Sequence, residues 1–212
     1  MQTRPLEVGP GILLCRGALA AETQQSLTRK IFELAKCAPF YRPRMPISGK
    51  PFSVEETNFG SLGWVSDEHG YRYSNTHPET GEPWPAIPNL LLRLWRSATQ
   101  YPEAPECCLV NLYRGAARMG LHQDRDEEAI DAPVLSISLG DSAIFRIGGV
   151  TRRSPTKSLR LESGDVLTFG GPARLAYHGI DRVVPDTSRL IPGGGRINLT
   201  LRRITRPEVA CY

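Results

Sequence analysis

Eight short runs of β-forming residues fill the second half of the chain, and two segments with helical periodicity precede them. This order predicts an α+β fold that is mainly β. Eight strands separated by turns are typical of a double-stranded β-helix, or jelly roll, in which two sheets face each other. We therefore expect a jelly-roll core at about residues 107–205 with flanking N-terminal helices, within a single domain that spans residues 1–212.

The helical segments are identified by periodicity and by a start signal. Within residues 22–38, apolar side chains recur on one stripe, at Leu27, Ile31, Leu34 and Ala38. Pro88 can begin a second helix that runs to about Gln100, because proline fits the first turn of a helix. Both helices are expected to flank the sheets.

The segment between the helices has a different composition. Residues 43–87 are rich in Pro, Gly, Asn and aromatic residues, so we expect hairpins and long loops there rather than packed core. Loops of this kind often contact substrate. The eight strand-like runs follow, at residues 107–113, 118–124, 132–140, 143–149, 158–164, 165–171, 174–180 and 196–204.

Composition excludes several classes of protein. Apolar residues make up 40% of the 212 residues and charged residues 23%, which is neither a disordered nor a membrane-protein composition. The five cysteines (Cys15, Cys37, Cys107, Cys108 and Cys211) form no C-x-x-C pair, and they are interpreted as reduced, mostly buried thiols. The N-terminal residues lack the apolar stretch of a signal peptide, so we expect a cytoplasmic protein without a membrane segment. The net charge of +4 favours polyanionic partners only mildly.

A metal site is indicated by two histidines and an aspartate. His122 and Asp124 are two positions apart in a strand-like run, so their side chains should lie on one face. His178 ends a later run that a jelly roll can bring beside them. Together they would form the two-histidine, one-carboxylate triad of non-haem iron(II) oxygenases. His-x-Asp is a short pattern, and unrelated polar residues remain the alternative.

The last strand-like run supports the iron interpretation. Its even positions are polar and its odd positions apolar, so one face would carry Arg196, Asn198, Thr200 and Arg202. Two arginines on an inner face are costly unless anions meet them, and a dicarboxylic acid supplies such anions. Asn111 and Tyr113 likewise share a face and offer donors. Each of these residues could instead be an ordinary polar residue, or the arginines could face solvent.

At these positions the sequence resembles the AlkB family of alkylation-repair dioxygenases, and its bacterial members closely. The likeness spans nearly the whole chain. It is carried by NLY at 111–113, LHQDRDE at 121–127, SISLG at 136–140, YHGI at 177–180 and RINLTLR at 196–202, and upstream by LGW at 62–64, GYRYS at 70–74 and PWP at 83–85.

The resemblance implies an activity and a set of site residues. The activity is oxidative demethylation of 1-methyladenine and 3-methylcytosine in DNA, and possibly RNA, with Fe(II), 2-oxoglutarate and O2, releasing formaldehyde. The residues implied are His122, Asp124 and His178 for iron; Asn111, Tyr113, Arg196, Asn198 and Arg202 for 2-oxoglutarate; and Trp64, Tyr71, Asp126 and Arg152 for the substrate, with His178 also stacking on the base. Alkylated nucleic acid, favouring single-stranded DNA, is the expected partner, with no obligate protein partner.

Several of these assignments have simpler alternatives. Trp64 and Tyr71 could be packing residues, and Asp126 could be one charge in a solvated run. A phosphate-binding role is open to a set of basic residues that could also be plain surface charge, namely Arg114, Arg118, Arg152, Arg153 and Lys157. His69 and His77 are expected to be exposed loop residues. Phe169 departs from the tryptophan of close relatives, so the volume of the pocket should differ.

Three other functions remain open from the sequence. The chain could be a 2-oxoglutarate dioxygenase that acts on RNA, protein or a small metabolite. It could also be a catalytically silent nucleic-acid-binding relative, although all three iron ligands are present. A cupin-like metal protein without 2-oxoglutarate is disfavoured by Arg196 and Arg202.

Overall fold

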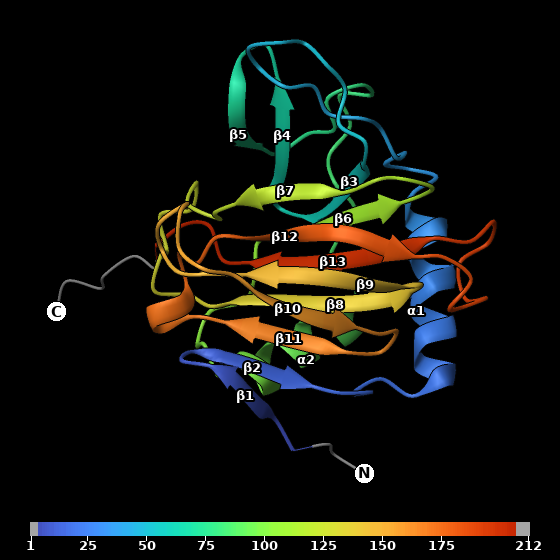
Figure 1. The fold of residues 1–212 in the computed structure, drawn as a ribbon. Helices are drawn as coiled ribbons and strands as arrows, with labels where there is room; N and C mark the ends of the chain where they lie inside the picture. The colour runs from blue at the N-terminus through green and yellow to red at the C-terminus, as the bar shows by residue number, and fades with distance from the viewer. Residues whose placement is uncertain (1–3, 207–212) are drawn as a thin grey trace, which may run out of the picture.

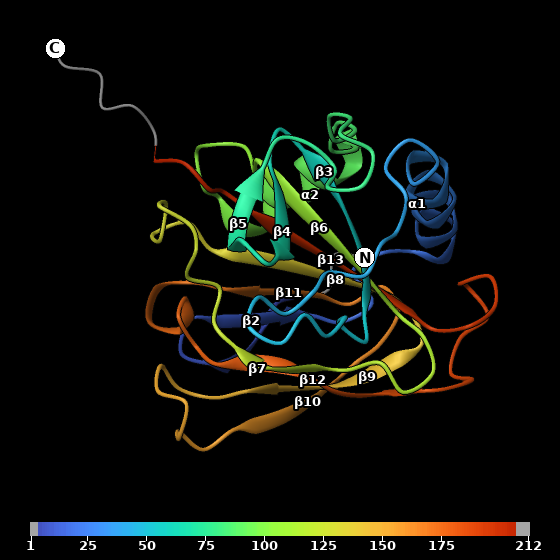
Figure 2. The ribbon, with the colours of Figure 1, turned by 90° about the horizontal axis from the view of Figure 1, so that it is seen from above.

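The structure, a computed structural model, describes residues 4–206 and contains two facing β-sheets. The larger sheet has the order β1-β2-β11-β8-β13-β6-β3, and the smaller one has the order β10-β9-β12-β7. In Figure 2 the helices, the larger sheet and the smaller sheet form successive layers. The bounds are β1 Leu6–Gly9, β2 Ile12–Cys15, α1 Ala21–Leu34, β3 Glu55–Gly60, β4 Gly63–Asp67, β5 Gly70–Ser74, α2 Asn89–Thr99, β6 Cys107–Tyr113, β7 Met119–His122, β8 Val134–Gly140, β9 Ser142–Ile147, β10 Lys157–Leu161, β11 Val166–Phe169, the 3-10 turn Gly171–Ala173, β12 His178–Val184 and β13 Arg196–Arg202.

The two predicted helices are present and cover the outer face of the larger sheet. Leu27 and Ile31 of α1 and Leu91 and Trp95 of α2 belong to one core cluster with the outward side chains of β6, β8 and β13. Helix α1 ends at Leu34, four residues before the predicted end, because turns follow it. Helix α2 agrees with the prediction: Pro88 precedes it, and Gln100 ends it in the left-handed conformation. The described helices lack the length and apolar character needed to cross a membrane.

All eight predicted strands are present in the two sheets, which confirms the jelly-roll prediction. The run at 174–180 is displaced, because its first residues follow a 3-10 turn and β12 begins only at His178. Strands β1 and β2 were not predicted, and they extend the larger sheet at one edge. A second core cluster, which includes Phe145, Leu167 and Phe169, fills the space between the sheets.

The segment 43–87 corrects one prediction. Strands β4 and β5 form a hairpin that projects from the sheets (Figure 1), as expected. However, β3 pairs with β6 as the edge strand of the larger sheet and its central residues are buried, so this part is packed core. His77 was predicted to be exposed and is buried, because Nε2 contacts the carbonyl oxygen of Pro39 and the ring packs between Tyr41 and Trp84.

The cysteines in the described residues are free thiols, as predicted. Cys107 and Cys108 are fully buried on β6, whereas Cys37 is exposed. Cys211 lies outside the described residues.

Candidate active site

Strand pairing in the smaller sheet brings the predicted metal ligands together. His122 ends β7 and His178 begins β12, and the two are register partners. Asp124 follows two residues after β7 has ended, so it lies in a loop rather than on a strand face as predicted. Nε2 of His122 lies 3.7 Å from Oδ1 of Asp124, and Nε2 of His178 lies 3.9 Å from Oδ2. One ligand atom from each residue lies within 4.8 Å of the other two.

Backbone geometry beside the histidines fixes their orientation. Nδ1 of His122 lies 2.9 Å from the carbonyl oxygen of Gly120, and Nδ1 of His178 lies 2.9 Å from that of Ala176. Each carbonyl favours the proton on Nδ1, which leaves the Nε2 lone pair free for a metal. Gly179 allows β12 to approach β7 closely, since a Cβ there would lie 2.6 Å from the carbonyl oxygen of Met119.

The electrostatics put Asp124 and His178 in the form that binds a metal. Burial alone raises the pKa of the Asp124 carboxyl, but Arg202 and the two histidines outweigh burial and hold this pKa below its usual range. Burial, reinforced by His122, lowers the pKa of His178 to about 4. At neutral pH the site therefore presents an ionised carboxylate and a neutral imidazole, as metal binding requires.

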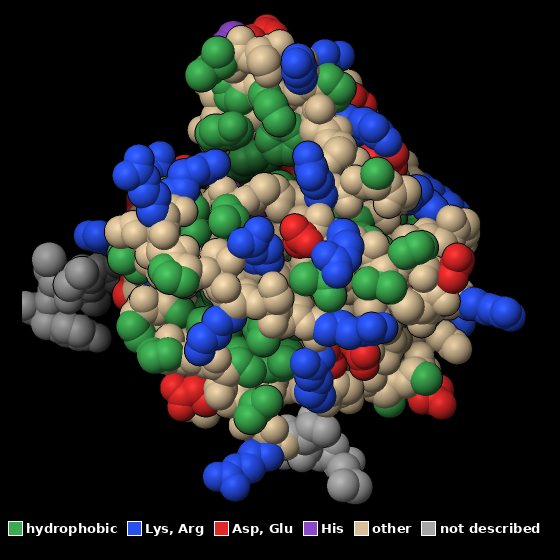
Figure 3. Space-filling model, in the orientation of Figure 1, with side chains coloured by type: hydrophobic (Ala, Val, Ile, Leu, Met, Phe, Trp, Pro, Cys, Tyr) green, Lys and Arg blue, Asp and Glu red, His purple; other side chains and the backbone are tan. Residues whose placement is uncertain are grey.

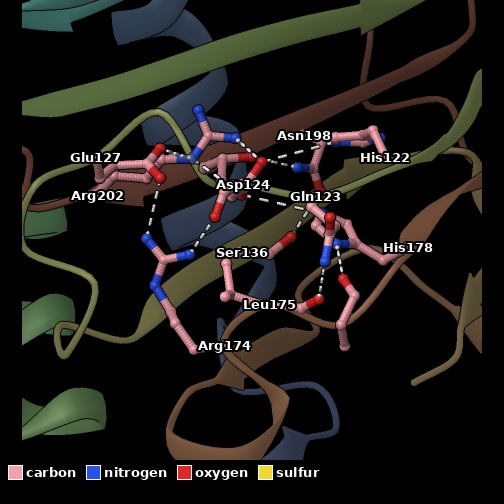
Figure 4. A network of polar contacts seen from close by, with 12 residues as sticks. His122, Gln123, Asp124, Glu127, Ser136, Arg174, Leu175, His178, Asn198 and Arg202 are labelled. Carbon is pink, nitrogen blue, oxygen red and sulfur yellow. Dashed lines mark hydrogen bonds and ion pairs between the residues drawn. The ribbon is translucent and has the colours of Figure 1, made fainter. Parts of the chain in front are cut away.

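Asp124 is held by a buried network of charged groups (Figure 4). Arg202 donates to both carboxylate oxygens of Asp124, from Nη2 at 2.8 Å and from Nε at 3.0 Å. Arg174 donates to the main-chain oxygen of Asp124 at 2.6 Å and to Oε2 of Glu127 at 3.1 Å. Tyr73, on the hairpin strand β5, donates to Oε1 of Glu127. The network therefore links the projecting hairpin to the metal ligand.

Arg196 contrasts with Arg202 because it has no acidic partner among the described residues. It is fully buried; Nη2 donates to Oγ of Ser138 at 2.8 Å and to Oδ1 of Asn198 at 3.3 Å, while Nε has no partner. Burial lowers the pKa of its guanidinium to about 10. A buried cation without a counter-ion is costly, so this end of β13 is suited to an anion.

Beside the metal ligands lies a cavity of about 580 Å³. Among the residues that line it are Asn111, Tyr113, Asn198, Thr200 and Arg202, all of which were predicted to face inward. Arg196 is the exception among the predicted 2-oxoglutarate residues, since it is buried beneath the lining. The donors of Asn111, Tyr113 and Asn198 therefore surround a space that a small dicarboxylate fits.

The predicted substrate residues lie at the rim of the cavity. The rings of Trp64 and Tyr71 stack, with centroids 5.5 Å apart and planes 19° apart, and Tyr71 is 54% exposed. Nε1 of Trp64 donates to Oδ2 of Asp126 at 3.2 Å. The guanidinium of Arg152 lies 5.9 Å from the centre of the Tyr177 ring. In Figure 3, hydrophobic side chains gather at the base of the projecting hairpin, with Lys and Arg side chains on both sides.

Arg118 and Arg114, two other predicted basic residues, differ in position. Arg118 lines the cavity, whereas Arg114 donates to the carbonyl oxygens of Pro192 and Gly194 and anchors that loop. Phe169 lies against His178, with ring centroids 4.7 Å apart. The smaller ring in place of the expected tryptophan therefore adjoins a metal ligand.

Four residues of the site were not identified from the sequence. Glu127 was treated as part of a solvated run, although it is the last residue of the LHQDRDE motif that carries the resemblance. Tyr73 lies in the GYRYS motif of the resemblance but was given no role, and Arg174 gave no signal, because the partners of both are distant in the chain. Glu56, a buried acid in the lining of the cavity, was also missed.

The chain is similar to known proteins over most of its length. The model of the 2OG-Fe(II) oxygenase superfamily matches residues 11–202. An alpha-ketoglutarate-dependent dioxygenase AlkB homolog of Caulobacter vibrioides is 57% identical over 96% of this chain and 92% of its own length. Alpha-ketoglutarate-dependent dioxygenase AlkB of Escherichia coli is 41% identical over 96% and 94%. The solved structure of OsALKBH1 has a TM-score of 0.82 at 31% identity, covering 94% of this chain and all of that one.

Proposed function

Because the chain belongs to the 2OG-Fe(II) oxygenase superfamily and, within it, to the AlkB family, we propose that it removes N-alkyl groups from bases in nucleic acid. It is an enzyme that uses iron(II), 2-oxoglutarate and O2. More distant relatives are named as a DNA N(6)-methyladenine demethylase in Arabidopsis thaliana and a tRNA demethylase in Schizosaccharomyces pombe. The observation that carries the proposal is the position of the His-Asp-His cluster beside a cavity with a stacked aromatic pair at its rim.

We assign iron to His122, Asp124 and His178. The donor set fits, since two imidazoles and a carboxylate with open positions suit non-haem iron(II). When bound, iron would supply the hydroxylation of the alkyl carbon by O2, with 2-oxoglutarate oxidised to succinate and carbon dioxide, and the hydroxylated N-methyl group would leave as formaldehyde. The protein groups hold the ligands in register and keep the carboxylate ionised through Arg202.

We assign 2-oxoglutarate to the inner faces of β6 and β13. One buried donor there, Nε of Arg196, has no partner among the described residues and is free to meet an anion. Arg196 supplies the positive charge, and Asn111, Tyr113 and Asn198 supply donors. Arg202 was predicted as a further ligand, and Nε and Nη2 of its guanidinium are engaged by Asp124. We propose that Arg202 acts first on Asp124. Its Nη1, which donates to the Tyr73 hydroxyl at a distance of 3.5 Å, would also meet the co-substrate.

We assign the base to the rim. A base methylated at N1 of adenine or N3 of cytosine carries a positive charge, and an aromatic face stabilises such a ring by about 0.5 to 2 kcal/mol. Trp64 would supply this face, and Tyr71 would back it, since the two rings are already stacked. Asp126 adds a negative charge while its contact with Nε1 of Trp64 fixes the indole. Neutral bases would gain less from these groups.

The nucleic-acid backbone would lie along the basic residues beside the rim. Arg118 and Arg152 line the cavity and are placed to meet phosphates, without reading sequence. We propose that single-stranded DNA is favoured, because a base in a duplex must first be unpaired and unstacked at a cost of a few kcal/mol. RNA is the second candidate, which the name of the tRNA demethylase relative supports.

The decisive experiment measures succinate formation and demethylation of the base in the same sample. Protein is loaded with Fe(II) without oxygen, then exposed to air with 2-oxoglutarate and a 1-methyladenine or 3-methylcytosine oligonucleotide. Loss of one methyl group per succinate formed is expected. Succinate without loss of methyl would contradict the substrate, and neither product from folded, iron-loaded protein would indicate a silent binder.

A further inference from the structure

Glu56 is a buried acid that no assignment above explains. It lies on β3, it is 0% exposed, and it is among the residues that line the cavity. Neither carboxyl oxygen has a hydrogen-bond partner within residues 4–206, although the main chain of Glu56 pairs with that of Tyr41. Buried carboxyl groups are normally satisfied by hydrogen bonds or counter-ions, so one that lacks both needs a physical explanation.

The sheet register places Glu56 opposite Asn111, which also has a buried polar atom without a hydrogen-bond partner in the described part of the chain. Strands β3 and β6 are antiparallel, and Glu56 is the direct partner of Asn111. Directly paired side chains lie on the same face, with Cβ atoms about 4.5 to 5.5 Å apart. Oδ1 of Asn111 is also buried without a partner. Asn111 in turn faces Asn198 of β13, so the three side chains form one polar row across the inner face.

The Glu56 carboxyl and Oδ1 of Asn111 can form a hydrogen bond with each other only if the carboxyl is protonated. An ionised carboxylate and an amide oxygen are both acceptors, and 2-oxoglutarate offers neither of them a donor. A protonated carboxyl has one O–H to donate. We propose that Glu56 stays protonated and donates a hydrogen bond to Oδ1 of Asn111, which turns the Asn111 amide NH2 toward a carboxylate of 2-oxoglutarate. Glu56 would then be a positioning residue, and this inference rests on the proposed co-substrate site.

The surroundings of Glu56 support the neutral form. Burial raises the pKa of Glu56 to about 8, although Arg202 on β13 opposes this rise. The other titratable groups that act on it are Tyr41 and Tyr113, and burial raises the pKa of each phenol, so both are neutral at physiological pH. Arg202 is already engaged by Asp124. The proton on Glu56 is therefore held at neutral pH and lost as pH rises through about 8.

The test measures binding of 2-oxoglutarate rather than turnover. Full-length protein loaded with Mn(II) is titrated with 2-oxoglutarate by calorimetry at several pH values. Glu56→Met keeps the volume but removes the donor, and it should weaken binding about tenfold, which corresponds to the loss of one hydrogen bond that orients an anion ligand. Glu56→Gln can still donate, so it should stay within about threefold of the wild type.

The pH series gives the second readout. Wild-type affinity for 2-oxoglutarate should fall above pH 8, whereas that of Glu56→Gln should not. The matched control is Glu55→Gln on the same strand, because Glu55 is partly exposed and pairs with Arg42. It should leave both the affinity and its pH dependence unchanged. If Glu56→Met fails to fold, the comparison of the wild type with Glu56→Gln still decides the question.

Two results would overturn the inference. One is equal 2-oxoglutarate affinity in Glu56→Met and the wild type; a raised KM of that variant for the methylated oligonucleotide would then place Glu56 against the base. The other is the same pH dependence of 2-oxoglutarate affinity in Glu56→Gln and the wild type. Because binding is measured without any methylated substrate, failure of base repair would leave this inference standing.

Discussion

The floor and the rim of the cavity are built in different ways. The floor consists of His122, Asp124 and His178, which two paired strands and a buried ion-pair network hold. The rim consists of Trp64 and Tyr71 on a hairpin outside both sheets, and its outer ring is more than half exposed. The difference indicates that the chemistry depends on preformed geometry, whereas substrate choice depends on a few side chains that can change at little cost to the fold.

One chain of contacts joins these two regions. Tyr73 on the hairpin donates to Glu127, and Glu127 lies 3.5 Å from Nε of Arg202, which binds Asp124. Burial raises the pKa of the Tyr73 phenol well above its usual value, so the hydroxyl keeps its proton and remains a donor. Variants in each region would show how independent the floor and the rim are.

The largest effect should come from removing a ligand of the floor. His122→Ala leaves two of the three metal ligands, so both iron retention and succinate production should fall below detection. Metal content after gel filtration and succinate release would be measured together. The control is His69→Ala, whose imidazole is exposed, and it should behave as the wild type. Retained succinate production in His122→Ala would refute the metal assignment.

The network below Asp124 should control stability. Glu127→Ala leaves Arg174 without its acidic partner in the interior, and breaking a buried pair in this way costs about 3 to 5 kcal/mol. The free energy of unfolding in urea measures this cost. The exposed pair Arg182–Asp181 is the control, since Asp181→Ala should change it by less than about 1 kcal/mol. Equal effects of the two variants would mean that burial of the floor network is unimportant.

The sequence predicted which face of a strand each side chain lies on better than it predicted which residues that side chain contacts. The strict alternation in β13 correctly indicated that its polar positions face inward, because a strand has only two faces. It could not indicate that Arg202 binds Asp124 while Arg196 binds no acid, since this depends on which strand adjoins each end.

The wrong predictions have the same origin. His77 lies in a segment rich in turn residues, but a carbonyl oxygen 38 positions earlier in the chain gives it a buried partner. Asp124 converges with His122 although it follows the end of the strand, so the two-residue period gave a correct pair for an incorrect reason. Contacts between distant segments decide these cases, and local pattern does not encode them.

Glu56 should make the free energy of unfolding of the protein depend on pH. Its pKa is about 8 in the folded protein, against 4.5 as the ordinary value. Between these two pH values the folded state therefore keeps the proton, whereas the unfolded state has lost it. The contribution of Glu56 to stability should therefore be lost as pH rises from about 5 to 8, by about 1.4 kcal/mol per pH unit. Urea unfolding of the wild type and Glu56→Gln at several pH values would measure the difference in slope. Identical slopes would contradict the neutral acid.

The smallest effect should come from the rim. Trp64→Ala removes a ring that would stack on a cationic base, so the KM for a methylated oligonucleotide should rise about tenfold, equivalent to about 1.4 kcal/mol. Trp64→Phe keeps a ring but loses the contact with Asp126, and it separates stacking from that hydrogen bond. Steady-state kinetics would give KM, with 2-oxoglutarate affinity and iron content measured on the same variants. The 2-oxoglutarate affinity and the iron content should be unchanged, because other residues hold the side chains of the floor. A loss of either would mean that Trp64 also holds the floor in place.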